Sequence, residues 1–267
     1  MSKKYPVYVE FYSIYYSIPI IQQKGHDKYI NEEVKKNPRQ MIFQNIHSLL
    51  GLVWEMLAII GLSGCEKTIF LNVLEDRTSK KNVEGTVKLN RHIPTKVSRH
   101  FVAYCTQDDI FFPYLISQLR LPHELPTSAK LEQVENIIQA LNLSKYSNTK
   151  IGDTRIHEIS GGERKQVSIA NELLTDPSVI LLDKPTSGLD MYSSLVLDLV
   201  QTLKEFAIKQ KKTIIMVIHQ PASQVFDLFD KLLLIADGQV AYFGDSKNIV
   251  DYLADEGFGI SPVASLS

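Results

Sequence analysis

The chain has 267 residues, of which 44% are hydrophobic, and this is enough to bury a sizeable core in one α/β domain. Its 29 Lys and Arg residues balance 30 Asp and Glu residues, so no overall positive field recruits nucleic acid or an anionic membrane surface. The most apolar runs are far shorter than the roughly 18 to 20 residues that span a bilayer, and the N-terminal segment lacks a signal-peptide cleavage site. We therefore expect no transmembrane segment and no nucleic-acid partner.

The first third of the chain predicts a β layer and then a strand–loop–helix unit. Residues 7–18 and 41–47 are rich in β-branched and aromatic residues, and a polar segment between them is interpreted as a loop. Residues 56–60 form a continuous apolar strand, which a glycine-containing loop joins to a helical pattern over residues 69–77. This order of elements is the setting in which a phosphate-binding loop occurs.

Three further apolar runs cover residues 179–183, 213–218 and 231–236. Their hydrophobicity is continuous rather than alternating, which predicts strands of a parallel sheet that is covered on both faces. Two helices with apolar stripes are also expected. The stripe of the helix that follows residue 183 consists of Val196, Leu199, Val200, Leu203 and Ala207. The stripe expected over residues 129–143 consists of Leu131, Val134, Ile138 and Leu141.

The segment GLSGCEKT, from Gly61 to Thr68, matches the phosphate-binding pattern G-x-x-x-x-G-K-[ST] except at its second glycine. In an intact loop the backbone N–H groups wrap the phosphates, the Lys neutralises their charge and the hydroxyl ligates Mg²⁺. Lys67 and Thr68 are present for the last two roles. Glu66 replaces the glycine, and a carboxylate about 4 Å from a phosphate charge costs on the order of 4 kcal/mol at an effective dielectric near 20.

Four more motifs follow in order: TQDD at 106–109, ISGGE at 159–163, VILLDKPTSGLD at 179–190 and VIHQP at 217–221. Together with the altered phosphate loop, they resemble the Q-loop, signature, Walker B, D-loop and switch motifs of ABC-type ATPases. Longer stretches such as IHQPASQVFDLFDKLLLIADGQVAYFG and DYLADEGF are similar to the G subfamily, the White-type half transporters. This resemblance covers roughly residues 5 to 260.

The resemblance implies the fold class and the division of the chain. It implies an α/β P-loop NTPase of ABC type, with a mostly parallel central sheet, an antiparallel β edge layer and an inserted helical lobe. Residues 1–267 would form a single ABC ATP-binding domain. Its core would cover residues 5–109 and 173–250, its helical lobe residues 110–172 and its tail residues 251–267.

The resemblance also implies ATP and Mg²⁺ as cofactors and a role for each matching position. Asp183, Thr68 and Gln107 would hold the metal, and Gln107 would also contact the attacking water. His219 would hold the terminal phosphate. Tyr16 would stack on adenine, with adjacent Tyr15 as one alternative and simple packing of Tyr16 in its strand as another.

Two groups of residues would bind the phosphates of ATP. The phosphate-loop group consists of Gly61, Ser63, Gly64, Cys65, Glu66, Lys67 and Thr68. The signature group, which consists of Ser160, Gly161, Gly162 and Glu163, would face the ATP of a partner domain, and Asp190 would lie at the dimer seam. Besides the place of Cys65 in the phosphate loop, both Cys65 and Cys105 are interpreted as ordinary buried cysteines with reduced thiols, because their spacing in the sequence is not that of metal ligands.

Lys184 departs from the family at the catalytic position. Related ATPases have a Glu there that orients or deprotonates the attacking water, and an ammonium group has no lone pair to accept that proton. We therefore predict slow hydrolysis or none. Glu66 and Lys184 are opposite-charge replacements in loops that converge on the same phosphates, so one hypothesis is an ion pair between them, and the alternative is drift.

The sequence supports two functions. In the first, the chain is the ATP-binding domain of a White-type transporter at the cytoplasmic side of a membrane, and it drives export of a lipophilic substrate. Its partners would be a second ABC domain and a transmembrane domain, either on a separate polypeptide or encoded by an exon outside this sequence. In the second, it is a weak regulatory partner that supplies its signature motif to a competent ABC domain. Residues 111–122 are shorter than in the family, which argues against full coupling to a membrane domain. A soluble ABC protein of translation or repair is disfavoured, because the chain has a single cassette.

Overall fold

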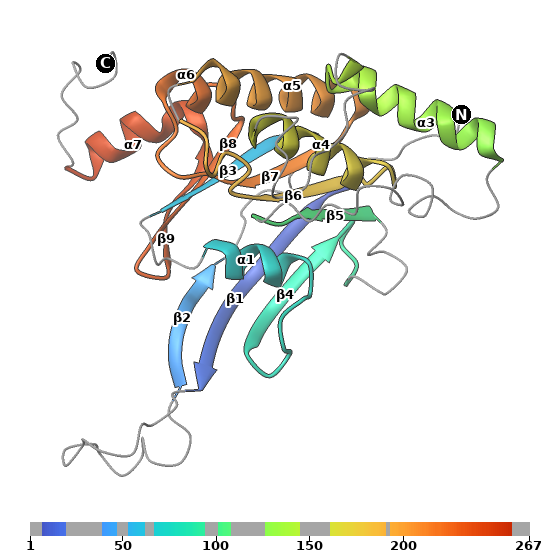
Figure 1. The fold of residues 1–267 in the computed structure, drawn as a ribbon. Helices are drawn as coiled ribbons and strands as arrows, with labels where there is room; N and C mark the ends of the chain where they lie inside the picture. The colour runs from blue at the N-terminus through green and yellow to red at the C-terminus, as the bar shows by residue number, and fades with distance from the viewer. Residues whose placement is uncertain are drawn as a thin grey trace, which may run out of the picture.

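The structure is a computed structural model that describes residues 7–19, 39–46, 53–61, 67–93, 101–107, 126–144, 161–190 and 193–257. The strands are β1 Val9–Pro19, β2 Arg39–Ile46, β3 Met56–Gly61, β4 Val83–Leu89, β5 Val102–Cys105, β6 Val179–Asp183, β7 Thr213–Val217, β8 Lys231–Ala236 and β9 Gln239–Asp245. The helices are α1 Lys67–Leu74, α3 Thr127–Ala140, α4 Gly161–Leu173, α5 Ser194–Gln210, α6 Ser223–Phe226 and α7 Ile249–Asp255, with the 3₁₀ turn η4 Ser246–Asn248. Figure 1 shows them in layers, with α1 between a smaller sheet and a larger one and α5 on the far side of the larger sheet.

The larger sheet has six strands in the order β5-β6-β7-β3-β8-β9. Its first five strands pair in parallel, and β9 pairs with β8 in the antiparallel sense. The three apolar runs that predict strands correspond to β6, β7 and β8, so the predicted parallel sheet is confirmed. Because the chain crosses over between neighbouring parallel strands, their carboxyl ends meet at one edge of the sheet, where ligands of α/β proteins bind.

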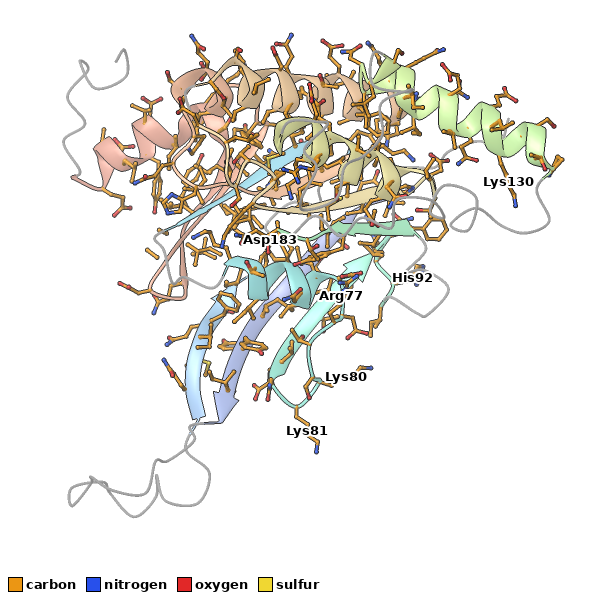
Figure 2. All side chains as sticks on the ribbon, in the orientation of Figure 1. Arg77, Lys80, Lys81, His92, Lys130 and Asp183 are labelled. Carbon is orange, nitrogen blue, oxygen red and sulfur yellow. The ribbon has the colours of Figure 1, made fainter. Side chains whose placement is uncertain are left out.

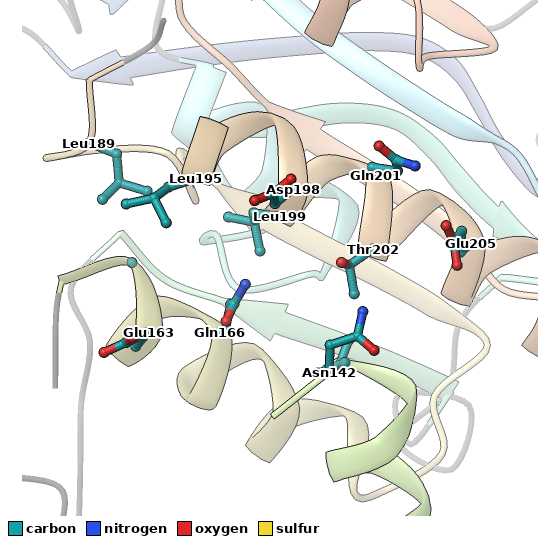
Figure 3. A pocket seen from close by; sticks show the side chains of 12 residues that line it. Asn142, Glu163, Gln166, Leu189, Leu195, Asp198, Leu199, Gln201, Thr202 and Glu205 are labelled. Atoms are coloured by element: carbon teal, nitrogen blue, oxygen red, sulfur yellow. The ribbon is translucent and has the colours of Figure 1, made fainter. Parts of the chain in front are cut away.

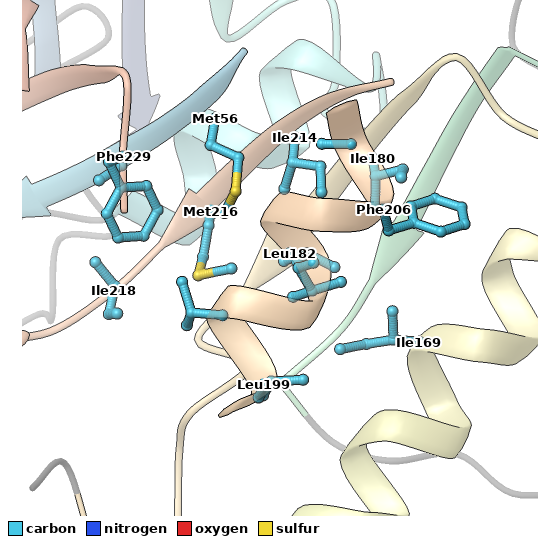
Figure 4. Close-up of a cluster of buried hydrophobic side chains, with 14 of the residues drawn as sticks. Met56, Ile169, Ile180, Leu182, Leu199, Phe206, Ile214, Met216, Ile218 and Phe229 are labelled. Atoms are coloured by element: carbon cyan, nitrogen blue, oxygen red, sulfur yellow. The ribbon is translucent and has the colours of Figure 1, made fainter. Parts of the chain in front are cut away.

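Alternate residues of each central strand enter two separate cores. In β3, Met56 and Ala58 face one cluster, while Leu57 and Ile59 face the other. The first cluster lies between the sheet and the helices α4 and α5, where Ile169 and Leu199 meet strand residues in Figure 4. Continuous hydrophobicity in the strands is therefore the result of burial on both faces.

The smaller sheet is antiparallel, in the order β2-β1-β4, and it confirms the predicted β edge layer. It packs on α1 through aromatic rings: the Phe70 ring lies 5.2 Å from Phe11 and 5.9 Å from Phe43 in edge-on contacts. Gly85 sits in this sheet at φ +100°, and a Cβ there would lie 2.2 Å from the Ser13 carbonyl oxygen. Only glycine fits the close approach of β4 to the irregular part of β1.

The two predicted helical stripes have different outcomes. All the stripe residues of α5 are buried, as expected. The prediction for α3 is partly wrong: Leu131 is 59% exposed, and no residue within α3 is buried. Ile137, Ile138 and Ala140 of α3 pack on the core, and Gln133 Nε2 donates a hydrogen bond of 2.6 Å to the Leu174 carbonyl oxygen. Leu141, the last residue of the predicted stripe, is buried just after the helix, whereas Leu131 lies about two turns before Ile138.

Two further expectations concern the membrane and the cysteines. In the part of the chain that the structure describes, no helix combines the length and apolar character needed to cross a bilayer. Cys105 is buried at the end of β5 and forms no disulfide, as expected, and Cys65 lies outside the described residues. The proposed boundaries of the helical lobe and the tail fall within or beside undescribed segments, and they stay predictions.

Leu203→Ala and Leu195→Ala compare a buried and an exposed leucine of the same helix, α5. Leu203 is fully buried and Leu195 is 50% exposed. We expect Leu203→Ala to lower the free energy of unfolding by about 2–5 kcal/mol, because it removes apolar contacts and leaves a cavity, and Leu195→Ala to lower it by less than about 1 kcal/mol. Urea titration of both variants measures this difference. Equal losses would contradict the described packing of α5.

Candidate nucleotide-binding site

The candidate site is built around Asp183, the last residue of the buried strand β6. Its side chain is only 3% exposed and accepts a hydrogen bond of 3.0 Å at Oδ1 from the Thr68 hydroxyl. Thr68 is the second residue of α1, so this bond joins the start of the first helix to the end of a central strand. Figure 2 shows Asp183 directly above α1.

Lys67 stands at the first position of α1, where the positive end of a helix dipole and unpaired backbone N–H groups favour anions. Its side chain is 4% exposed, and Nζ donates a hydrogen bond of 2.8 Å to the carbonyl oxygen of Gly61 at the end of β3. An ammonium group is thereby held across the mouth of the loop that joins β3 to α1. Its position at the helix start fits a lysine that reaches the phosphates of a nucleotide.

Burial raises the pKa of Asp183 above its ordinary value, although the Thr68 hydrogen bond and the charges of Lys184, Lys165 and Lys67 pull that pKa down. Without a metal, the ionised carboxylate therefore stands in an unfavourable environment. A divalent cation would offset that cost. The Thr68 hydroxyl and the Asp183 carboxylate are hard oxygen ligands on adjoining elements, so these residues fit Mg²⁺.

Among the described residues, no group of three or more His, Cys, Asp and Glu side chains is placed to hold a metal ion. Mg²⁺ usually takes one or two protein ligands and completes its shell with water and phosphate oxygens.

Gln107 follows β5 and is held by contacts from three directions. Its side-chain Oε1 accepts a hydrogen bond of 3.3 Å from Lys184 Nζ, and its Nε2 donates one of 3.4 Å to the Ser187 hydroxyl. Its backbone carbonyl accepts a hydrogen bond of 2.8 Å from Lys165 Nζ, which also donates to the Thr106 carbonyl. Gln107 and Lys184 are therefore brought together at the edge where Asp183 lies.

Lys165 is a site residue that the sequence analysis missed. Its side chain is buried in α4, and it is the residue that connects this helix to the segment of Gln107. The signal available in the sequence is a basic residue two positions after the SGGE motif, although charged residues at this spacing are common on solvated helix faces.

His219 lies two residues beyond β7, and β7 pairs with β6 so that Val217 stands opposite Asp183. The half-buried His219 therefore follows the strand next to Asp183 at the same edge of the sheet. Its contact with the terminal phosphate stays a prediction.

Three of the four signature residues, Gly161, Gly162 and Glu163, lie at the start of α4. Gly161 is exposed, and a Cβ there would meet no atom within 4 Å, whereas Gly162 is buried beside Leu189 and Leu195. Glu163 occupies the first turn of the helix. The exposed Asp190 accepts hydrogen bonds at its carbonyl oxygen from the backbone and the hydroxyl of Ser193, which caps the entry to α5.

A cavity of about 310 Å³ lies between α4 and α5 beside these glycines (Figure 3). Glu163, Asp198 and Glu205 give its lining a negative character, and none of its lining residues is Lys or Arg. Carboxylates repel phosphate, so this cavity does not suit ATP. The phosphate chemistry is instead at Lys67 and Asp183.

Tyr16 is 9% exposed, stands opposite Phe43 and Val83 in the smaller sheet, and has its ring 6.2 Å from the Phe43 ring. This geometry agrees with the packing alternative, because stacking on adenine would need the ring to turn out of the core. The neighbouring Tyr15 is half-buried. Adenine stacking by either tyrosine stays a prediction.

Several predicted site residues lie outside the described residues, namely Ser63, Gly64, Cys65, Glu66 and Ser160. The hypothesis of a Glu66–Lys184 ion pair lies there with them. In the structure, Lys184 Nζ donates a hydrogen bond to the side chain of Gln107.

The fold and the site together define a P-loop nucleotide-binding domain, in which a helix-initiating Lys-Thr pair meets the Asp at the end of a central strand. Residues 54–187 match the family model described as ABC transporter, and the chain belongs to this family. The match confirms the family resemblance and the fold class predicted from the motifs.

Curated relatives place the chain near the G subfamily. It is 37% identical over 236 residues to ABC transporter G family member 25 of Arabidopsis thaliana, in a match that covers 85% of this chain and 35% of the relative. It is 38% identical over 241 residues to Protein white of Drosophila melanogaster, with 85% and 34% covered. The chain thus spans about a third of the length of these relatives.

A solved structure supports the fold. An ATP-binding cassette described as dimeric, in a post-hydrolysis state and bound to ADP and Pi, superposes with a TM-score of 0.66 at 18% identity, over 89% of this chain and 98% of that one.

Asp183→Asn tests the electrostatic state of the site. Because the folded protein raises the pKa of Asp183 above 3.8, it binds this proton more readily than the unfolded chain does, and stability falls as pH rises from about 4 through the raised pKa. In EDTA without nucleotide, Asp183→Asn should remove this contribution and melt at a higher temperature than wild type at pH 7. Thermal unfolding between pH 4 and 8 measures it.

Asp198→Asn, on the exposed face of α5, is the control and should change the free energy of unfolding by less than about 0.5 kcal/mol. A lower melting temperature for Asp183→Asn than for wild type at pH 7 would contradict the described environment of the carboxylate.

Proposed function

We propose that the chain is the ATP-binding domain of a G-subfamily ABC transporter, which binds ATP and Mg²⁺ to power movement of a lipophilic substrate through a membrane domain outside this chain. The observation that carries the proposal is the hydrogen bond between Thr68 and Asp183 beside the buried ammonium group of Lys67. The domain would work at the cytoplasmic side of a membrane and pair with a second ABC domain.

Each residue has a defined task in this proposal. Lys67 exchanges its hydrogen bond to the Gly61 carbonyl for a phosphate oxygen, because an anion is the stronger acceptor. Thr68 and Asp183 hold Mg²⁺, which when bound neutralises charge on the phosphate oxygens. His219, beyond the neighbouring strand, holds the terminal phosphate.

Hydrolysis is slow in this proposal because the groups that would prepare the attacking water are compromised. Lys184 replaces the glutamate that accepts or orients the water proton, and its ammonium group has no lone pair for that purpose. Its amine also donates to Oε1 of Gln107, the oxygen that Gln107 would otherwise offer to water. Positioning of the nucleophile is a large part of catalysis in phosphoryl transfer.

A second candidate function is a regulatory partner that lends its signature motif to a competent ABC domain. The first turn of α4 supports it, because Gly161 is exposed and open space surrounds its Cα. Backbone N–H groups at such a helix start can approach the phosphates of another domain closely. This function does not require turnover at the chain's own site.

Lys184→Glu should raise the ATP turnover of the purified chain at least about tenfold, since a positioned general base contributes on the order of 10²- to 10⁴-fold. Phosphate release at saturating ATP and Mg²⁺ measures the rate. The double variant Lys184→Glu with Asp183→Asn is the matched control and should return turnover to background. An unchanged rate in Lys184→Glu, with ATP still bound, would contradict the assigned role of position 184.

Mixing the chain with an intact G-subfamily ATP-binding domain separates the two functions. If the chain lends its signature motif, the mixture should release phosphate at least about twofold faster than the sum of its components, and Gly161→Trp should abolish the gain by filling the open space at the start of α4. No gain in the mixture would remove the lending function, and efficient turnover by the chain alone would favour a self-sufficient ATPase.

A further inference from the structure

The amine of Lys184 is held by a weak acceptor. Its hydrogen bond to the neutral amide oxygen of Gln107 is 3.3 Å long, whereas bonds between an ammonium group and an anionic oxygen are typically about 2.7–2.9 Å. An anion that entered the site would therefore be a better partner for this amine than Gln107 is.

The backbone of Lys184 is fixed while its side chain can change partner. Its N–H donates a hydrogen bond of 3.1 Å to the Val217 carbonyl of β7, and its φ of 45° directs the chain away from β6 into the turn that contains Ser187. A lysine side chain is a compact charge on a flexible four-carbon stem. The amine can therefore exchange acceptors without any movement of the strand.

The charges at the site favour a highly charged anion. Three ammonium groups, those of Lys67, Lys165 and Lys184, act on the single carboxylate of Asp183. A Glu at position 184, as in the family pattern, would instead set two ammonium groups against two carboxylates.

We propose that Lys184 binds the terminal phosphate of a nucleoside triphosphate, so that the site retains ATP in preference to ADP and keeps this preference without a divalent cation. The inference rests on the proposed function, in which nucleotide binds beside Lys67 and Asp183. A diphosphate lacks the group that Lys184 binds, and the lysine supplies positive charge that the site would otherwise take from Mg²⁺ alone. The replacement converts a hydrolytic position into a specificity-determining one.

Binding of the triphosphate also releases the side chain of Gln107. Its backbone stays attached to α4 through Lys165, and its Nε2 stays beside Ser187.

Calorimetric titration of ATP and ADP, each in Mg²⁺ and in EDTA, tests the proposal. Wild type should bind ATP at least about tenfold more tightly than ADP in both buffers. Lys184→Met should weaken ATP binding by about tenfold to a hundredfold, the range for loss of a charge-assisted hydrogen bond, and change ADP binding by about twofold or less. Lys184→Arg should restore much of the preference, because it keeps the charge.

A control at another lysine makes the result specific. Lys209→Met, at an exposed lysine of α5, should change neither affinity. If Lys184→Met unfolds, Lys184→Gln gives the same comparison with a side chain that still hydrogen-bonds. Equal losses for ATP and ADP, or no loss for ATP, would overturn this inference alone. Wild type that binds neither nucleotide would overturn the proposed function and this inference with it.

Discussion

The hydrogen bond between Thr68 and Asp183 is the contact on which the site depends. It joins the first turn of α1 to the carboxyl end of β6, a strand of the larger sheet whose two faces are buried in two separate cores. A carboxylate in so buried a position is unfavourable unless hydroxyl, ammonium or metal partners stabilise it. Strand β6 therefore ends in a carboxylate, that of Asp183, which does not favour the stability of the fold. Its environment instead suits the binding of a cation and of phosphate.

The lysine that follows Asp183 changes what this environment can do. In a hydrolase of this family a carboxylate at position 184 would prepare water, and in the proposed function an ammonium group at the same place would instead attract the phosphate that water would attack. The contact of Lys184 with Gln107 would occupy a second group that acts on the nucleophile. In the proposed function the two effects act in the same direction, towards binding without efficient turnover.

Much of this arrangement could be predicted from the sequence. Continuous apolar runs predict β6, β7 and β8, because strands buried on both faces cannot alternate with polar residues. The order of motifs predicts that Lys67, Thr68 and Asp183 meet, since a P-loop lies at the carboxyl edge of a parallel sheet. These predictions depend on backbone geometry that many sequences share.

The missed features depend on contacts between segments far apart in the sequence. The partner of Lys184 is 77 residues away, and whether it is Gln107 depends on how the segment after β5 lies against the turn after β6. Leu131 has the spacing of a core residue but is exposed, whereas Ile137 and Ile138 of the same helix pack on the core. Hydrophobic periodicity predicts which face of a helix is apolar, but it does not predict how far along the helix the neighbouring surface extends.

A crystal structure of the chain with ATP and Mg²⁺ tests the central claim most directly. The account predicts a metal ion between Thr68 and Asp183, with the terminal phosphate in hydrogen-bond distance of the Lys67 and Lys184 amines and with Lys184 released from Gln107. A bound nucleotide whose terminal phosphate leaves Lys184 on Gln107, or a metal ion bound away from Asp183, would contradict it.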